Sequence, residues 1–142
     1  MSYKILYINL ILLALVMNLG CGQEEKEANA NQDKEEAGSP AMEFEKVYHD
    51  FGSLKAGEKV SYTFKFKNSG GSELIIKDAV AGCGCTVPKY DKHPIAPGEK
   101  GSVEVIFDTR GRRGTQIQTV LIKNNTPYGE KTLTIKANVV SN

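Results

Sequence analysis

Two cysteines separated by a single glycine, Cys83 and Cys85, have the spacing in this 142-residue chain that most directly suggests chemistry. An oxidising compartment favours a disulfide between them. The distance also permits one, because alpha carbons two residues apart can lie within the roughly 4.4–6.8 Å that a disulfide needs. Gly82 and Gly84 give the backbone the freedom that so tight a ring requires. The ring cross-links little chain, so its entropic contribution to stability is small. So small a ring is also strained, and we therefore expect it to be reduced more easily than a structural disulfide.

Two other interpretations of the pair remain open. As thiolates, the two cysteines suit Cu(I) or Zn, with His93 or His49 as a further ligand. Zinc sites, however, normally space their cysteines by two to four residues and use four ligands. In the other interpretation, the cysteines are inert or intermolecularly paired thiols in a bend. We therefore predict a disulfide or thiol site at Cys83 and Cys85 and expect no cofactor. No metal site is established, and its candidate ligands are Cys83 and Cys85 with His93, or with His49 in its place.

Three arginines, Arg110, Arg112 and Arg113, cluster between turn residues and form a second candidate site. Arginine forks suit an anion such as a lipid phosphate. A solvated turn is the simpler explanation of such a charge cluster. The sequence thus offers an anion contact at these three residues as the functional alternative.

No catalytic constellation is recognisable in the chain. The Gly-x-Ser-x-Gly and His-Glu-x-x-His motifs and a phosphate-binding glycine-rich loop are all missing from the sequence. Cys85 and His93 are eight residues apart in a loop, which is no evidence of contact. The formal net charge of +1 argues against nucleic-acid binding, which needs a strong basic excess. We therefore expect a protein that is not an enzyme, with no catalytic residues and no nucleic-acid partner.

The elements that position these residues are predicted to be strands. Apolar and polar side chains alternate most clearly over residues 60–67, 102–108 and 132–139, which is typical of strands with one buried face. Weaker strand patterns cover residues 44–48, 74–80 and 117–123. Turn residues separate the strands: residues 50–52 are expected to close the first one, and residues 110–114 to form a hairpin. About seven short strands in roughly 100 residues predict an all-β fold, an immunoglobulin-like antiparallel β-sandwich.

The N-terminus predicts export and a lipid anchor. Lys4 is followed by an apolar run from Ile5 to Leu19, which fits a signal peptide and is shorter than the roughly 20 residues of a membrane span. Gly20 and Cys21 follow, a pair that resembles the end of a bacterial lipobox, although Asn18 stands where an aliphatic residue is usual. The resemblance implies that Cys21 becomes the lipidated first residue after cleavage.

The next twenty residues are strongly polar and are predicted to be a disordered linker. They contain six acidic and two basic residues, and alanine is their only hydrophobic residue type. Glu24, Glu25 and Glu27 resemble an acidic export signal of surface lipoproteins, and a solvated linker explains them equally well. We therefore divide the chain into a lipoprotein signal peptide (1–20), a lipidated cysteine with its acidic linker (21–41) and an immunoglobulin-like domain (42–142).

An ordered set of short motifs in the last segment resembles a known bacterial family. They are His49-Asp50-Phe51-Gly52, Gly57-Glu58, Phe64-Lys65-Phe66-Lys67-Asn68-Ser69-Gly70, Cys83-Gly84-Cys85-Thr86-Val87-Pro88, Ile95-Ala96-Pro97-Gly98-Glu99 and Phe107-Asp108-Thr109. The set is similar to the domain-of-unknown-function family 1573, immunoglobulin-like domains of Bacteroidetes-type lipoproteins akin to the hydin and abnormal-spindle domains. The resemblance implies the fold and a cell-envelope location, but no biochemical activity.

Taken together, these patterns predict an exported protein that is lipid-anchored to the outer membrane, on its periplasmic or surface side. We expect a non-enzymatic binding or structural module whose partners are the membrane and a protein or glycan of the envelope. The alternative is a thiol-redox or soft-metal accessory protein, handling copper or zinc through Cys83 and Cys85.

Overall fold

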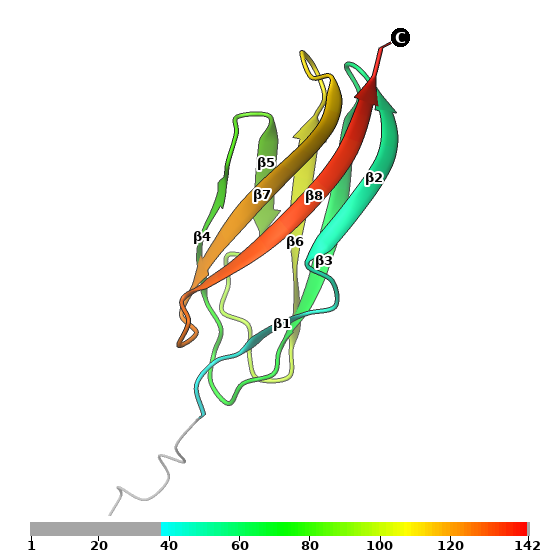
Figure 1. The fold of residues 1–142 in the computed structure, drawn as a ribbon. Coiled ribbons are helices and arrows are strands. Elements are labelled where there is room, and N and C mark those ends of the chain that lie inside the picture. The colour runs from blue at the N-terminus through cyan, green and yellow to red at the C-terminus, as the bar shows by residue number, and fades with distance from the viewer. Residues whose placement is uncertain (1–37, 142) are drawn as a thin grey trace, which may run out of the picture. The chain divides into compact units, whose positions relative to one another are not determined.

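The computed structural model describes residues 38–141, which form a sandwich of two four-stranded sheets (Figure 1). The strands are β1 (Met42–Phe44), β2 (Tyr48–Lys55), β3 (Lys59–Asn68), β4 (Ile76–Ala81), β5 (Thr86–Tyr90), β6 (Lys100–Asp108), β7 (Gly114–Asn124) and β8 (Glu130–Val140). One sheet has the order β1-β3-β6-β5 and the other β2-β8-β7-β4. The predicted immunoglobulin-like sandwich is confirmed, with eight strands. Among the described residues, no helix is long and apolar enough to cross a membrane.

The N-terminal part of the domain differs from the prediction, because it contributes one strand to each sheet. β1 pairs antiparallel with β3, whereas β2 pairs parallel with β8, so the sandwich is not purely antiparallel. Residues 50–52, expected to end the first strand, form an irregularity inside β2, where the register shifts between Asp50 and Ser53. Gly52 adopts a φ of +70° there, and its N–H donates to Asp50 Oδ1 at 2.8 Å. The bulge absorbs one extra residue while β2 continues along β8.

The predicted hairpin at residues 110–114 is also wrong. β6 pairs with β3 and β5, while β7 pairs with β4 and β8, so the segment between β6 and β7 crosses from one sheet to the other. β5 was missing from the prediction. It is a short edge strand that contains Pro88, and proline is tolerated at a sheet edge because its missing N–H faces away from the ladder.

The core lies between the two sheets and follows the predicted alternation. Phe64 and Phe66 of β3 meet the alternate residues Val103, Val105 and Phe107 of β6, and all five are almost completely buried. The facing sheet contributes the inward residues of its strands, which include Val120, Ile122, Leu133, Ile135 and Ala137. Strands with one apolar face therefore account for the whole sandwich.

The loops gather at the two ends of the sandwich, which we call the base and the tip. The base contains the β3–β4, β5–β6 and β7–β8 connections and the point where the described chain begins (Figure 1). Residues 39–41, which we assigned to the linker, are held there: Ser69 N–H donates to Ala41 O at 3.0 Å and Gly71 N–H to Ser39 O at 3.3 Å.

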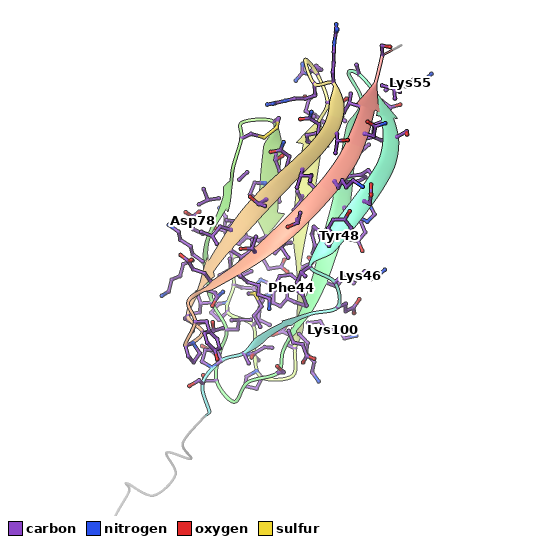
Figure 2. The ribbon with its side chains drawn as sticks, viewed as in Figure 1. Phe44, Lys46, Tyr48, Lys55, Asp78 and Lys100 are labelled. Carbon is purple, nitrogen blue, oxygen red and sulfur yellow. A yellow bond between two sulfur atoms is a disulfide. The ribbon has the colours of Figure 1, made fainter. Side chains whose placement is uncertain are left out.

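The tip is the opposite end. It contains the β2–β3, β4–β5 and β6–β7 connections together with the C-terminus (Figure 1). Figure 2 shows Lys55, the last residue of β2, at this end, and Phe44 and Lys100 towards the base. The sandwich therefore keeps the tip apart from the start of the described chain by the length of its strands.

Candidate functional site

The tip brings together two candidate sites that are more than twenty residues apart in the sequence. β5 pairs with β6 in a register that sets Thr86 opposite Phe107, so the cysteines just before β5 lie beside the turn that follows β6. The N–H of Asp108 donates to Cys85 O at 2.9 Å. An open hollow of about 420 Å³ lies at this junction, lined by Gly84, Cys85, Asp108, Arg110 and Arg112.

The structure joins Cys83 to Cys85 by a disulfide, with the alpha carbons 5.3 Å apart. Both cysteines are half-buried, and Cys85 packs against the edge of the core. The backbone fixes the loop on either side: Gly82 N–H donates to Thr119 O at 3.1 Å and Thr86 N–H donates to Cys83 O at 3.4 Å. The disulfide therefore lies at the tip on a loop that is fixed by backbone hydrogen bonds, and both of its cysteines are partly exposed to solvent.

Thr86 places a buried hydroxyl beside the disulfide, a feature that the sequence analysis did not single out. Its side-chain oxygen lies 3.6 Å from Cys83 Sγ and 3.8 Å from Cys85 Sγ, and the residue is only 4% exposed. Among the described residues, these two sulfurs are the only hydrogen-bond partners of this hydroxyl. A buried hydroxyl needs a partner for its hydrogen, so the Thr86 O–H is directed to the sulfurs. The sequence offered one indication of this contact, namely that a threonine directly follows Cys85.

The three predicted arginines differ in their surroundings. The Arg110 guanidinium clamps Asp108, with Nη2 2.6 Å and Nε 2.8 Å from Oδ2. The hydrogen bonds from Arg110 lower the pKa of Asp108 from 3.8 to about 2, and the same pair raises the pKa of Arg110. Within the described part of the chain, the side chains of Arg112 and Arg113 have no ion pair or hydrogen bond. Arg112 and Arg113 are therefore the arginines available for an anion.

A buried threonine ties the turns of the tip together. Thr109 has no exposed surface, and its hydroxyl oxygen lies 2.9 Å from Lys55 O and 2.8 Å from Glu58 O. Its N–H also donates to Glu58 O, at 2.9 Å. The β2–β3 turn is thereby fixed to the start of the arginine turn, which limits the movement of these two turns relative to each other.

The histidines lie away from the disulfide. His93 follows the end of β5, whereas the cysteines precede its start, and five extended residues span about 17 Å. His49 on β2 stacks on Tyr62 with ring centroids 3.7 Å apart, and partial burial lowers its pKa. No group of three or more potential metal ligands occurs in residues 38–141. The structure thus brings neither histidine to the cysteines, while Cys21 lies outside the described residues.

Other residues of the quoted motifs support the scaffold. Asn68 is completely buried at the base, where its Nδ2 donates to Ser72 O and Ile95 O. Its Oδ1 accepts from the N–H groups of Ala41 and Gly70, at 3.3 and 3.0 Å. Asp50 accepts from Lys136 Nζ at 3.0 Å, which attaches β2 to β8. Asn68 and Asp50 therefore have structural roles. Of these motifs, Cys-Gly-Cys-Thr is the one that contains a reactive group, the disulfide.

The structural relatives are proteins of varied kinds that share this sandwich. A protein of unknown function from Porphyromonas gingivalis W83 is 21% identical with a TM-score of 0.63, over 72% of this chain and 48% of that one. The chain thus spans about half the length of that protein. The ASH/PapD-like domain 7 of human CEP192 is 10% identical with a TM-score of 0.61, over 73% of this chain and 88% of the domain.

An enzyme is also among the relatives. The VesB protease of Vibrio cholerae is 19% identical with a TM-score of 0.53, over 71% of this chain and 31% of the protease. At these identities the likenesses show the fold alone. No curated protein matches the chain. The sequence model of the DUF1573 family, described as a protein of unknown function, matches residues 42–139, which run from the start of β1 to the last residue but one of β8. The chain therefore belongs to the DUF1573 family, as its motifs predicted.

Proposed function

We propose that this protein is a lipid-anchored, non-enzymatic module of the bacterial cell envelope that presents the tip of its sandwich to a protein or glycan partner. The family and the immunoglobulin-like fold support a binding or structural role. The anchor at Cys21 and the location at the outer membrane rest on the N-terminal sequence pattern. In this proposal the signal peptide is removed and the segment that begins at Cys21 connects the lipid to the base.

The observation that carries the proposal is that the two ends of the sandwich differ. The described chain enters at the base, and the candidate site lies at the tip. The described chain starts at the base, where residues 39–41 are hydrogen bonded to the β3–β4 turn. Arg112 and Arg113, whose side chains have no ion pair or hydrogen bond among the described residues, stand at the tip together with the disulfide. Loops presented by a rigid sandwich are the usual place for recognition. An anchor at one end leaves the other end free for a partner.

Anchoring is tested by comparing the wild-type chain with the Cys21→Ser variant expressed in a bacterium that processes lipoproteins. Membranes are washed with alkaline carbonate, and the protein is measured in pellet and supernatant. We expect the wild type in the pellet and the variant in the supernatant, because several acyl chains on Cys21 would hold the protein firmly. Cys21 lies outside the sandwich, so the variant keeps its fold. Equal partition of the two proteins would overturn the proposed anchor.

The partner surface is tested separately by exchanging Arg112 and Arg113 for alanine. Binding to isolated envelope membranes and to their glycolipids is measured by co-sedimentation of Cys21→Ser protein, so that the anchor cannot contribute. We expect the double variant to bind at least about fivefold more weakly, since two charge-assisted contacts are lost. The control is Lys123→Ala, which removes an exposed charge next to the β7–β8 connection at the base. Unchanged binding of the arginine variant would remove the tip as the partner surface.

A further inference from the structure

We propose that the Cys83–Cys85 disulfide is a site of thiol–disulfide exchange that accepts thiols carrying negative charge. This inference goes beyond the binding role, since it assigns the tip a stoichiometric covalent reaction with a partner thiol. It rests on three observations at the tip: the small ring, the Thr86 hydroxyl and the basic hollow beside Cys85.

The ring makes this disulfide a poor structural crosslink. It spans one intervening residue, so it removes little conformational freedom from the unfolded chain. The loop is held independently by backbone hydrogen bonds from Gly82 and Thr86, and the fold is closed by its sheets. Opening the ring therefore leaves the sandwich intact. Half-buried at the tip, the sulfurs are also within reach of a small thiol or a flexible peptide.

The surroundings distinguish the two sulfurs. Cys85 lines the open hollow, whereas Cys83 is not among its lining residues. A thiolate that enters the hollow therefore reaches Cys85 first, and Cys83 is the leaving group. The Thr86 hydroxyl lies 3.6 Å from Cys83 Sγ and has only the two sulfurs as partners in the described structure. It can donate its hydrogen to the departing thiolate, which stabilises the charge that develops there.

The exchange balances without any further reagent. The incoming thiolate sulfur forms a bond to Cys85 Sγ, the Cys83–Cys85 bond breaks, and its electron pair leaves with Cys83 Sγ. The incoming sulfur is oxidised, Cys83 is reduced, and Cys83 takes up from water a proton equivalent to the one that the thiol released. A second thiolate can then attack the partner's sulfur, which releases the partner as a disulfide and leaves Cys83 and Cys85 reduced.

The charge of the tip selects the thiol. Residues 108–113, the turn beside the disulfide loop, carry three basic side chains and one acidic side chain. Arg110 and Asp108 are paired with each other, while Arg112 lines the hollow with no partner in the described structure. An approaching anion is attracted to this site and a cation is repelled. The chemical class of substrate is therefore a thiol with carboxylates nearby, such as a cysteine within an acidic peptide.

The test compares two small thiols of opposite charge, glutathione and cysteamine, at equal thiolate concentration and low salt. It uses the full chain with Cys21→Ser, so that Cys83 and Cys85 supply the only sulfurs that can exchange and anchoring plays no part. The rate of ring opening is followed by intact mass. We expect glutathione to react at least about fivefold faster than cysteamine, and high salt to remove the difference.

Two sets of variants locate the effect. Exchange of both Arg112 and Arg113 for glutamine should abolish the preference for glutathione, whereas Lys123→Gln, at the base, should retain it. Thr86→Val should slow both thiols by roughly fivefold without changing the preference, because the donor to the leaving thiolate is lost. Thr86→Ser keeps a hydroxyl and should restore the rate, which separates this role from a packing effect. Equal rates for the two thiols, or a preference that survives the arginine exchange, would overturn the inference whatever the outcome of the anchoring test.

Discussion

At the scale of single residues, the tip depends on Thr109, whose buried hydroxyl connects the β2–β3 turn to the arginine turn. Thr109→Val removes the hydroxyl but keeps the volume and the β-branched shape. The carbonyls of Lys55 and Glu58 each lose a hydrogen-bond partner, so we expect the free energy of unfolding to fall by roughly 1–3 kcal/mol. Urea denaturation measures the change. The same exchange at the exposed Thr119 should alter stability by less than about 0.5 kcal/mol. Equal effects at the two sites would contradict this role.

The Asp108–Arg110 pair gives a second prediction at this scale. With the pKa of Asp108 lowered to about 2 from 3.8, the carboxylate stays ionised through the mildly acidic range. Because the folded-state pKa lies below the ordinary value, the pair contributes stability above about pH 4 and loses it as the pH falls through about 2. The carboxyl carbon shift in an NMR titration should therefore have its midpoint near pH 2. Arg110→Gln should raise that midpoint and Arg113→Gln should not. A midpoint that is the same in all three proteins would show that Arg110 does not set it.

At the scale of the elements, a glycine on β6 allows the core to close near the base. A methyl group at Gly101 would lie 2.4 Å from Phe66 Cζ and 2.7 Å from Ile95 Cδ1, both in the buried core. Gly101→Ala should destabilise the domain by about 1–3 kcal/mol through overpacking. Gly82→Ala is the control, because its nearest contact would be an ordinary 3.7 Å and neither glycine has a positive φ. Thermal unfolding of the two variants measures the difference. If the Gly101→Ala protein were as stable as the Gly82→Ala protein, the core would accommodate the added methyl group and the prediction would be wrong.

The elements also show how far the sequence predicts the fold. The three clearest alternations lie within β3, β6 and β8, because a strand with one buried face needs period-two patterning whatever its neighbours are. Sheet membership has no such local signal. The expected hairpin after β6 is a crossover, and the expected first strand is divided between the sheets, because both depend on pairing with distant strands. β5 escaped prediction because Pro88 and its short length are tolerated only at an edge.

The candidate site was predictable in its parts but not in its assembly. Cys83, Cys85 and the arginines were each recognisable from residue type and spacing. Their meeting depends on the register of β5 against β6, which is set by pairing between segments about twenty residues apart. The same register excludes His93 from the site by placing it beyond the far end of β5. Thr86 and Thr109 act through burial and hydrogen bonds, which no local pattern reveals.

At the scale of the whole molecule, we propose a chain that has a lipid on Cys21 near its N-terminal end and a disulfide at the tip of its sandwich. One experiment tests these together: the intact mass of the protein extracted from membranes in detergent and alkylated without reductant. We predict a chain that begins at acylated Cys21, carries no alkyl adduct, and is lighter by the two hydrogens lost when Cys83 and Cys85 are joined. A chain that retains residues 1–20, or that carries alkyl groups on both tip cysteines, would contradict the account.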